Sequence, residues 1–146
     1  MSVGSDFKDY LKSKATVTNH IGTGASARIF DRLGKQGGTL PRILFNVDSG
    51  AAEYTLQGLA GAAQTIVQTW CYGTDTDNAD EVDQAVRSAL VGTTGLNGRG
   101  SMGSTKVMDI RDIGPFWGED KSQDNADDYD PFVRRVYTIM HHEATT

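Results

Sequence analysis

Two long stretches of alternating residues on either side of a glycine- and alanine-rich turn constrain this fold most strongly. The first stretch opens at Pro41, and its two faces carry Ile43, Phe45 and Val47 on one side and Arg42, Leu44 and Asn46 on the other. The second, 64–72, carries Ile66, Gln68, Trp70 and Tyr72 on one face and Val67, Thr69 and Cys71 on the other. A period of two is typical of strands. The pattern predicts a long β-hairpin, with its tip marked by Gly58 and Gly61, that projects beyond the body.

The next stretch is the clearest helix of the sequence. One apolar stripe is formed by Ala79, Val82, Val86, Ala89 and Leu90. Asn78, with Glu81 three residues later, resembles a capping box and is expected to begin the helix. Gly92 is expected to end it. Such an amphipathic helix must lie on a sheet or on another helix.

The remaining segments complete an α+β pattern. We expect a first helix at 5–14 with Ser5 as its N-cap and Asp6 and Asp9 in its first turn, and a short turn at 16–21. We expect strands at 27–33, 105–113 and 132–142, with an acidic loop at 119–130 before the last one. In the strand at 105–113, Val107, Asp109, Arg111 and Ile113 are expected on one face and Lys106, Met108 and Ile110 on the other.

This order of elements predicts an α+β fold with a largely antiparallel β-sheet. We expect about 4–5 strands, two helices packed on the sheet and a projecting β-hairpin. The 146 residues suffice for a single domain. Residues 1–26 are expected to form an N-terminal helix and linker, and 27–143 the core.

The charges of the chain are divided unevenly. The formal net charge is −5, which argues against binding of duplex DNA. Residues 1–73 carry 7 basic and 5 acidic residues, whereas 74–146 carry 7 and 14. Such asymmetry indicates charged faces that dock on a partner, or an ordinary soluble surface. No apolar run is as long as the about 18 residues that a membrane span needs. No secretory signal is visible before Lys14. The expected compartment is therefore the cytoplasm, where Cys71 would be reduced.

No motif of an enzyme or a cofactor site is complete. Gly98, Gly100 and Gly103 spell G-x-G-x-x-G, but they follow a helix and precede a strand, so a flexible loop is favoured over a nucleotide site. Cys71 lies between two aromatic residues, which favours a buried and inert thiol. We therefore expect no catalytic residues and no cofactor.

Metal sites are also disfavoured. The acidic residues Asp75, Asp77 and Asp80 lack the glycine and glutamate of a calcium loop. His141 and His142 are consecutive on a predicted strand, so their side chains point to opposite faces. His20 lies far away in the sequence.

The segment 119–130 carries six acidic residues and one lysine. A mobile, solvated loop is the favoured interpretation, and weak chelation of a hard cation is the alternative. We expect this segment to face a partner and to become ordered on assembly. Its acidic residues are Glu119, Asp120, Asp124, Asp127, Asp128 and Asp130.

The order of motifs over 27–143 resembles a known family. A strand "LPRILFNV" leads to a tip "YTLQGLAGAAQT" and a strand "IVQTWCYG", and a helix "DNADEVDQAVRSALVG" follows. The strands "VMDIRDIGPFWGED" and "FVRRVYTIMHH" complete the series. This series resembles the tail completion, or tail-terminator, proteins of long-tailed phages and phage-like particles.

The resemblance implies a virion structural protein without catalysis. Members of the tail-terminator family form rings, usually of six subunits. These rings cap the tail tube, end its polymerisation and join the tail to the head or neck. The expected partners are further copies of the chain, the tail tube protein and the head–tail connector, with DNA passing through the channel. The expected location is the tail or neck of a virion assembled in the host cytoplasm. The hairpin residues expected at a subunit or tube interface are Tyr54, Leu56, Gln57 and Leu59.

Two other functions remain open from the sequence. One is a small cytoplasmic binding or adaptor module whose acidic loop binds a cation. The other is an enzyme with an unfamiliar site.

Overall fold

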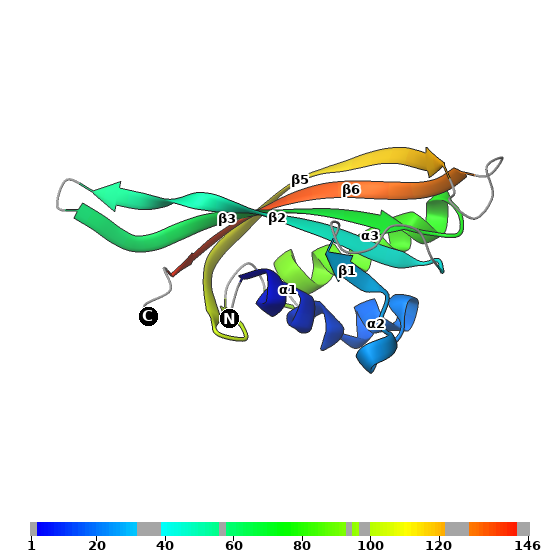
Figure 1. The fold of residues 1–146 in the computed structure, drawn as a ribbon, viewed down its shortest axis with the longest axis horizontal. Helices are drawn as coiled ribbons and strands as arrows, with labels where there is room; N and C mark the ends of the chain where they lie inside the picture. Colours follow the sequence, from blue (N-terminus) through cyan, green and yellow to red (C-terminus); the bar gives the residue numbers. More distant parts are fainter. Residues whose placement is uncertain are drawn as a thin grey trace.

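A computed structural model describes residues 3–31, 39–55, 58–92, 95–96, 100–121 and 129–142 of the chain, and side chains are described outside 49–62 and 121. A six-stranded sheet spans the molecule (Figure 1), in the order β1-β2-β3-β6-β5-β4. The strands are β1 (Ile29–Asp31), β2 (Arg42–Thr55), β3 (Gly58–Tyr72), β4 (Gly100–Met102), β5 (Thr105–Lys121) and β6 (Tyr129–His142). Only the pairing of β1 with β2 is parallel among the described strands.

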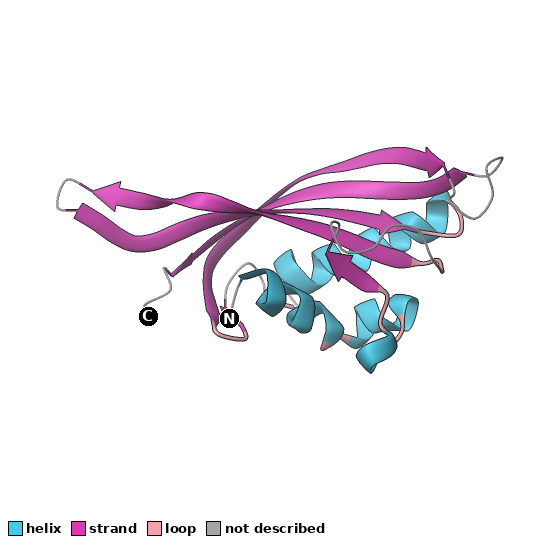
Figure 2. Ribbon diagram, in the orientation of Figure 1, coloured by secondary structure: helices cyan, strands magenta, loops and turns pink. Residues whose placement is uncertain are grey.

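The helices lie together on one face of this sheet (Figure 2). They are α1 (Val3–Lys12), α2 (Ala15–Ile21) and α3 (Thr76–Val91), and a 3-10 turn (Gly24–Ser26) leads into β1. The mixed α+β fold with a mostly antiparallel sheet is thus as predicted. The described residues form more strands and one more helix than the sequence predicts, because 16–21 forms α2 rather than a turn.

The main core lies between the helices and the sheet. Each helix contributes fully buried side chains, and the sheet contributes the face that the alternation assigns to Ile43 and Phe45 on β2 and to Val67 and Cys71 on β3. Burial of these side chains, at about 25 cal/mol per Å² of apolar surface, holds the helices on the sheet. The buried hydrophobic residues of the helices are Phe7, Leu11, Val17, Ile21, Ala79, Val82, Val86, Ala89 and Leu90.

A second, smaller cluster lies on the opposite sheet face. Leu44, Trp70 and Tyr72 are buried there against the partly buried Phe30, Leu40 and Phe132. The described helices leave this face uncovered (Figure 2). The predicted separation of Leu44 from Ile43 on β2, and of Trp70 from Cys71 on β3, is therefore confirmed.

The start of α3 differs from the prediction. Asp75, not Asn78, is the N-cap, and its carboxylate accepts a hydrogen bond from the backbone N–H of Asn78 at 2.7 Å. The Asn78 side chain instead accepts from the backbone N–H of Thr74 at 2.9 Å. Asp75 and Asn78 are both good N-cap residues, and they lie three positions apart. The helix begins after Asp75, which makes it about one turn longer than a start after Asn78. Gly92 ends the helix as predicted.

The alternation predicted for β5 is wrong after Val107. The register against β6 shifts between Val107 and Asp109, which is the signature of a β-bulge. Val107 and Ile110 therefore both join the core beneath the helices, although the alternation places them on opposite faces. A second shift lies between Ile113 and Phe116, where Gly114 has a φ of 141°.

Several element boundaries also differ from the predictions. The first helix begins at Val3, so Ser5 lies inside it and is not its N-cap. The strand predicted at 27–33 begins at Ile29, and residues 32 and 33 lie outside the described residues. Gly58, paired with Thr55, opens β3 at the end of the hairpin, whereas Gly61 lies further inside β3. The strands β5 and β6 extend into the predicted loop at 119–130, whose remainder, 122–128, lies outside the described residues.

The structure describes part of the glycine-rich connection after α3. Gly100 lies in β4, and Gly103, with a φ of 57°, lies in the turn to β5. Gly98 lies outside the described residues. The buried Asp6 of α1 accepts hydrogen bonds from Ser104 Oγ at 2.9 Å and Thr105 Oγ1 at 2.7 Å. Asp6 is thus an anchor for this turn, beyond its predicted role in the first helical turn.

Candidate functional site

The β2–β3 hairpin extends well past the helices, at the left of Figure 1. β1 pairs with β2 only at Ile29–Asp31, and β6 pairs with β3 from Ala62 onward. The hairpin beyond Ala62 is therefore two strands wide within the described residues. A two-stranded ribbon is marginally stable alone in water, so this ribbon gains stability from any surface that covers it.

Two of the four predicted hairpin residues, Tyr54 and Leu59, lie at the far end of the described ribbon. Tyr54 and Leu59 are directly opposite each other in the register of β2 and β3. Leu56 and Gln57 lie outside the described residues. Their role at an interface stays a prediction.

The predicted acidic segment is divided between strands and the region outside the described residues. Glu119 and Asp120 lie at the end of β5 and Asp130 at the start of β6, and Asp120 is opposite Asp130 in the register. The Tyr72 hydroxyl donates a hydrogen bond to the Asp120 carboxylate. Arg42 pairs with Asp130 at 3.4 Å and lies over the Tyr72 ring. Asp120 and Asp130 thus already have partners on the body, while Asp124, Asp127 and Asp128 lie outside the described residues.

Exposed hydrophobic side chains gather on one strand, which the sequence analysis missed. Among the described side chains, the large hydrophobic ones that stay exposed all lie on β5 or at the first residue of β6. Ile113 and Trp117 are 62% and 61% exposed, and Phe116 is 44% exposed. We call Ile113, Phe116 and Trp117 the β5 strip. The adjacent aromatic pair was visible in the sequence, but its exposure was not. Phe116 and Trp117 are consecutive in the register against β6, so their side chains point to opposite faces of the sheet, and Trp117 lies on the side of Thr76.

Beside Trp117, the start of α3 and the end of β5 enclose a shallow depression of 180 Å³. It is lined by Thr76, Trp117, Gly118, Glu119, Pro131 and Phe132. The Phe132 ring lies over Gly118, where a Cβ would come within 2.5 Å of it. A larger depression of 510 Å³ lies between α1 and the sheet, and is lined by Val3, Gly4, Ser5, Lys8, Asp31, Phe45, Val47 and Thr65.

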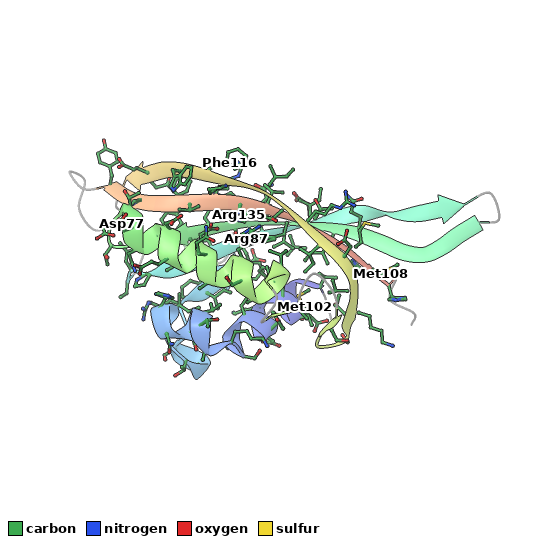
Figure 3. The ribbon with its side chains drawn as sticks, turned by 180° about the vertical axis from the view of Figure 1, so that it is seen from behind. Asp77, Arg87, Met102, Met108, Phe116 and Arg135 are labelled. Carbon is green, nitrogen blue, oxygen red and sulfur yellow. The ribbon has the colours of Figure 1, made fainter. Side chains whose placement is uncertain are left out.

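A buried ionic cluster joins α3 to β5 and β6. Arg135 donates hydrogen bonds from Nε and Nη2 to the Asp83 carboxylate, the latter at 2.8 Å, and from Nη1 to Asp112 at 2.6 Å. Arg87 donates to the same Asp112 at 3.0 Å. Figure 3 shows Arg87 and Arg135 between the helix and the sheet. The Arg135 and Asp83 side chains are 3% and 0% exposed, so this pair is shielded from water.

The pKa values of this cluster follow from burial and pairing. Burial raises the pKa of Asp83, and Arg135 opposes that rise. Burial likewise acts to raise the pKa of Asp112, but the hydrogen bonds and charges of Arg87 and Arg135 outweigh it and lower the pKa. The cluster fills its own hydrogen-bonding capacity, so its geometry suits fixing α3 on the sheet rather than binding a ligand.

The residues considered for chemistry do not come together. Cys71 is fully buried, and burial raises the pKa of its thiol well above the ordinary value. A thiol held in its neutral form is a poor nucleophile. His141 is buried with Nε2 at 2.8 Å from Thr65 Oγ1, whereas His142 is exposed. Within the described ranges, three or more histidine, cysteine or acidic side chains do not gather as a metal site.

No helix in the described part of the chain is both long and apolar enough to cross a membrane.

No protein-family model matches the chain, and no curated protein matches its sequence. Among solved structures, a chain from the virion of a native gene transfer agent particle has a similar fold, with a TM-score of 0.64. The similarity covers 97% of this chain and 96% of that chain, at 14% sequence identity. At this identity the likeness is one of fold, and it extends over nearly the whole of both chains.

Proposed function

We propose that this chain is a structural protein of the virion of a long-tailed phage or phage-like particle. The observation that carries the proposal is the whole-length similarity of fold to a chain of a gene transfer agent virion. The series of sequence motifs over 27–143, which resembles tail-terminator proteins, supports it independently. Function is not fixed by fold, so the motifs and the surfaces must agree with the role.

Within the virion, we propose a ring that caps the tail tube, ends its polymerisation and joins the tail to the head or neck. The projecting β2–β3 hairpin supports this role, because its ribbon needs a covering surface and reaches beyond the helical body. Tyr54, Leu56, Gln57 and Leu59 are the proposed contacts with the tube or a neighbouring subunit. The acidic segment 119–130 is the proposed contact with a further partner, and it becomes ordered on assembly.

The net charge supports a channel component that does not hold DNA. The chain carries 14 basic and 19 acidic residues. A surface with this balance repels phosphates, so DNA slides past it without sticking. We propose assembly in the host cytoplasm and location at the tail or neck.

The test is tube assembly with the tail tube protein of the same particle, followed by electron microscopy. With the chain present, we expect tubes of limited length that carry a ring at one end. Without it, we expect tubes of uncontrolled length. Unchanged tube lengths, with the chain absent from tube ends, contradict the proposal. A rise in melting temperature with millimolar calcium, without tube binding, favours the adaptor function instead.

A further inference from the structure

Trp117 presents an exposed indole ring beside the start of α3. Its side chain points to the sheet face on the side of Thr76, whereas the side chain of Phe116 points to the opposite face. Trp117 forms part of the wall of the 180 Å³ depression between β5 and α3. This volume is below the about 300–1,000 Å³ of pockets that enclose whole small molecules. The depression is therefore suited to a single side chain.

The two adjacent aromatic rings of β5 differ in their electrostatic partners. The guanidinium group of Arg134 lies over the Phe116 ring, 5.2 Å from the ring centroid. Arg42 lies in the same way over Tyr72, at 4.4 Å. Within the part of the chain that the structure describes, no cation lies over the Trp117 ring. Indole binds cations more strongly than the rings of phenylalanine and tyrosine, so Trp117 is the ring best suited to a cation from outside the chain.

A carboxylate lies on the same face as this ring. Glu119 is exposed, lies two residues beyond Trp117 on β5 and lines the same depression. Among the described residues, Glu119 forms no ion pair, whereas its neighbour Asp120 accepts a hydrogen bond from Tyr72. A guanidinium group pairs with a carboxylate through its planar fork of N–H groups and stacks on an aromatic ring through its flat face. Trp117 and Glu119 together offer both contacts.

The surroundings of the depression are acidic. Residues 75–81 and 117–121 together carry six acidic residues and one basic one. Figure 3 shows Asp77 at the start of α3, at the end of the molecule where β5 ends. The N-terminus of a helix carries a partial positive charge of about half a unit. Here the Asp75 cap and Asp77 of the first turn outweigh it, so the local field attracts a cation.

We propose that this depression binds an arginine side chain of a partner protein, with the guanidinium group stacked on Trp117 and paired with Glu119. That the partner belongs to the same virion rests on the proposed function, whereas the chemistry of the contact does not. The chain has a net charge of −5, so a basic partner is attracted and a second copy is repelled. A single charged contact of this kind selects and orients a partner within a larger interface.

The test is an NMR titration of the isotope-labelled chain, alone in solution, with the peptide acetyl-Gly-Arg-Gly-amide. We expect the indole N–H signal of Trp117 to shift and to saturate at millimolar peptide. The same peptide with citrulline, the neutral isostere of arginine, is expected to leave this signal in place. A lysine peptide is expected to bind more weakly, because an ammonium group lacks the planar fork. Added salt is expected to weaken the binding of the arginine peptide.

Two variants each remove one part of the site. Glu119→Gln removes the charge, and Trp117→Leu removes the aromatic ring. Each is expected to weaken the binding by about two- to fivefold, as for an exposed ion pair or an exposed cation–π contact. The backbone N–H of Thr76, which lines the depression, reports on binding where the indole is absent.

Matched controls separate this site from the general properties of the surface. Glu81→Gln removes the same charge from an exposed residue that does not line the depression, and Phe116→Leu removes an exposed ring from the opposite face. Both are expected to bind the arginine peptide like the wild type. All four variants are expected to keep the wild-type circular dichroism, because the altered side chains are exposed.

Three outcomes overturn the inference: no saturable shift of the Trp117 signal, an equal shift with the citrulline peptide, or equal weakening by Glu119→Gln and Glu81→Gln. A Trp117 signal that moves when the chain alone is concentrated would assign the depression to a second copy and overturn the choice of partner.

These measurements are independent of tail tubes. A chain that caps tubes without binding arginine leaves the proposed function standing. A chain that binds arginine without capping tubes leaves the arginine site standing.

Discussion

Arg135 is the residue at which three elements meet. Its guanidinium group bridges Asp83 of α3 and Asp112 of β5 from its own position on β6. Moving two charges out of water costs several kcal/mol each unless the two charges pair with one another. The pair is therefore more sensitive to losing one member than to losing both.

We predict that Arg135→Met lowers the free energy of unfolding by about 3–5 kcal/mol, because it leaves the Asp83 carboxylate buried without its partner. The double variant Asp83→Leu/Arg135→Met should recover most of that loss. Urea unfolding at neutral pH measures both. The explanation is contradicted if the double variant loses as much free energy of unfolding as the two single variants lose together.

Asp112 gives a pH dependence of definite sign. Its pKa is lowered from 3.8 in the folded protein, so its charged form stabilises the fold at neutral pH. That contribution is complete above the pKa of the unfolded chain and is lost as the pH falls through the folded pKa. We predict that Asp112→Asn destabilises the protein most near pH 7 and progressively less toward pH 3. Urea unfolding at several pH values checks this, and a difference that grows as the pH falls contradicts it.

The sequence could not reveal this cluster. Asp83 lies between apolar positions of a helix, where it passes for an ordinary acidic residue near the N-terminus. Arg135 lies on a strand with no purely apolar face. Their partnership spans 52 residues and depends on how α3 crosses the sheet. Alternation, in contrast, is a local property, which is why it correctly separated Ile43 from Leu44 and Trp70 from Cys71 within their strands.

At the scale of elements, the N-cap of α3 can be tested directly, because the structure has Asp75 where the sequence predicts Asn78. We predict that Asp75→Ala lowers the free energy of unfolding by about 1 kcal/mol, because the N–H of Asn78 loses its acceptor. Asp77→Ala is the matched control, since it removes the same charge from the first turn without removing the observed cap. Chemical denaturation of the two variants compares them. Equal losses would mean that charge, not capping, dominates.

The β4–β5 turn offers a second test at this scale. Gly103 has a φ of 57°, and an added Cβ would lie 2.7 Å from the Asp6 carboxylate that anchors the turn. Gly24 has a φ of 62° with nothing within 4 Å of its added Cβ. We predict that Gly24→Ala costs about 1 kcal/mol from backbone strain, and that Gly103→Ala costs more. Thermal unfolding gives the comparison, and equal costs would show that Asp6 moves aside freely.

The elements that sequence reasoning missed share a cause. Both shifts of β5 arise from pairing with β6, and neither has a mark in local alternation other than Gly114 and Pro115. The exposure of the β5 strip depends on which strands flank β5 in the sheet, and the local sequence does not show that. The hairpin was predictable because two long alternating stretches lie next to each other in the chain.

At the scale of the whole molecule, the hairpin is separable from the core. Within the described residues, the parts of β2 and β3 beyond Ala62 pair only with each other, whereas the rest of β3 also pairs with β6. Replacing 53–62 by Asn-Gly would join Ala52 to Ala63, which are paired in the register, through a favourable two-residue turn. We predict a melting temperature close to that of the wild type and loss of tube capping, measured by calorimetry and by electron microscopy. Capping that persists in the shortened variant would remove the hairpin from the contact.

The contrast between the two tryptophans gives the protein its own optical reporter. Trp70 is 7% exposed in the cluster on the uncovered sheet face, whereas Trp117 is 61% exposed at the edge. Indole emission shifts to shorter wavelength when water leaves its surroundings. In a Trp70→Phe background, the emission of Trp117 would therefore follow coverage of the β5 edge in real time, without any attached dye.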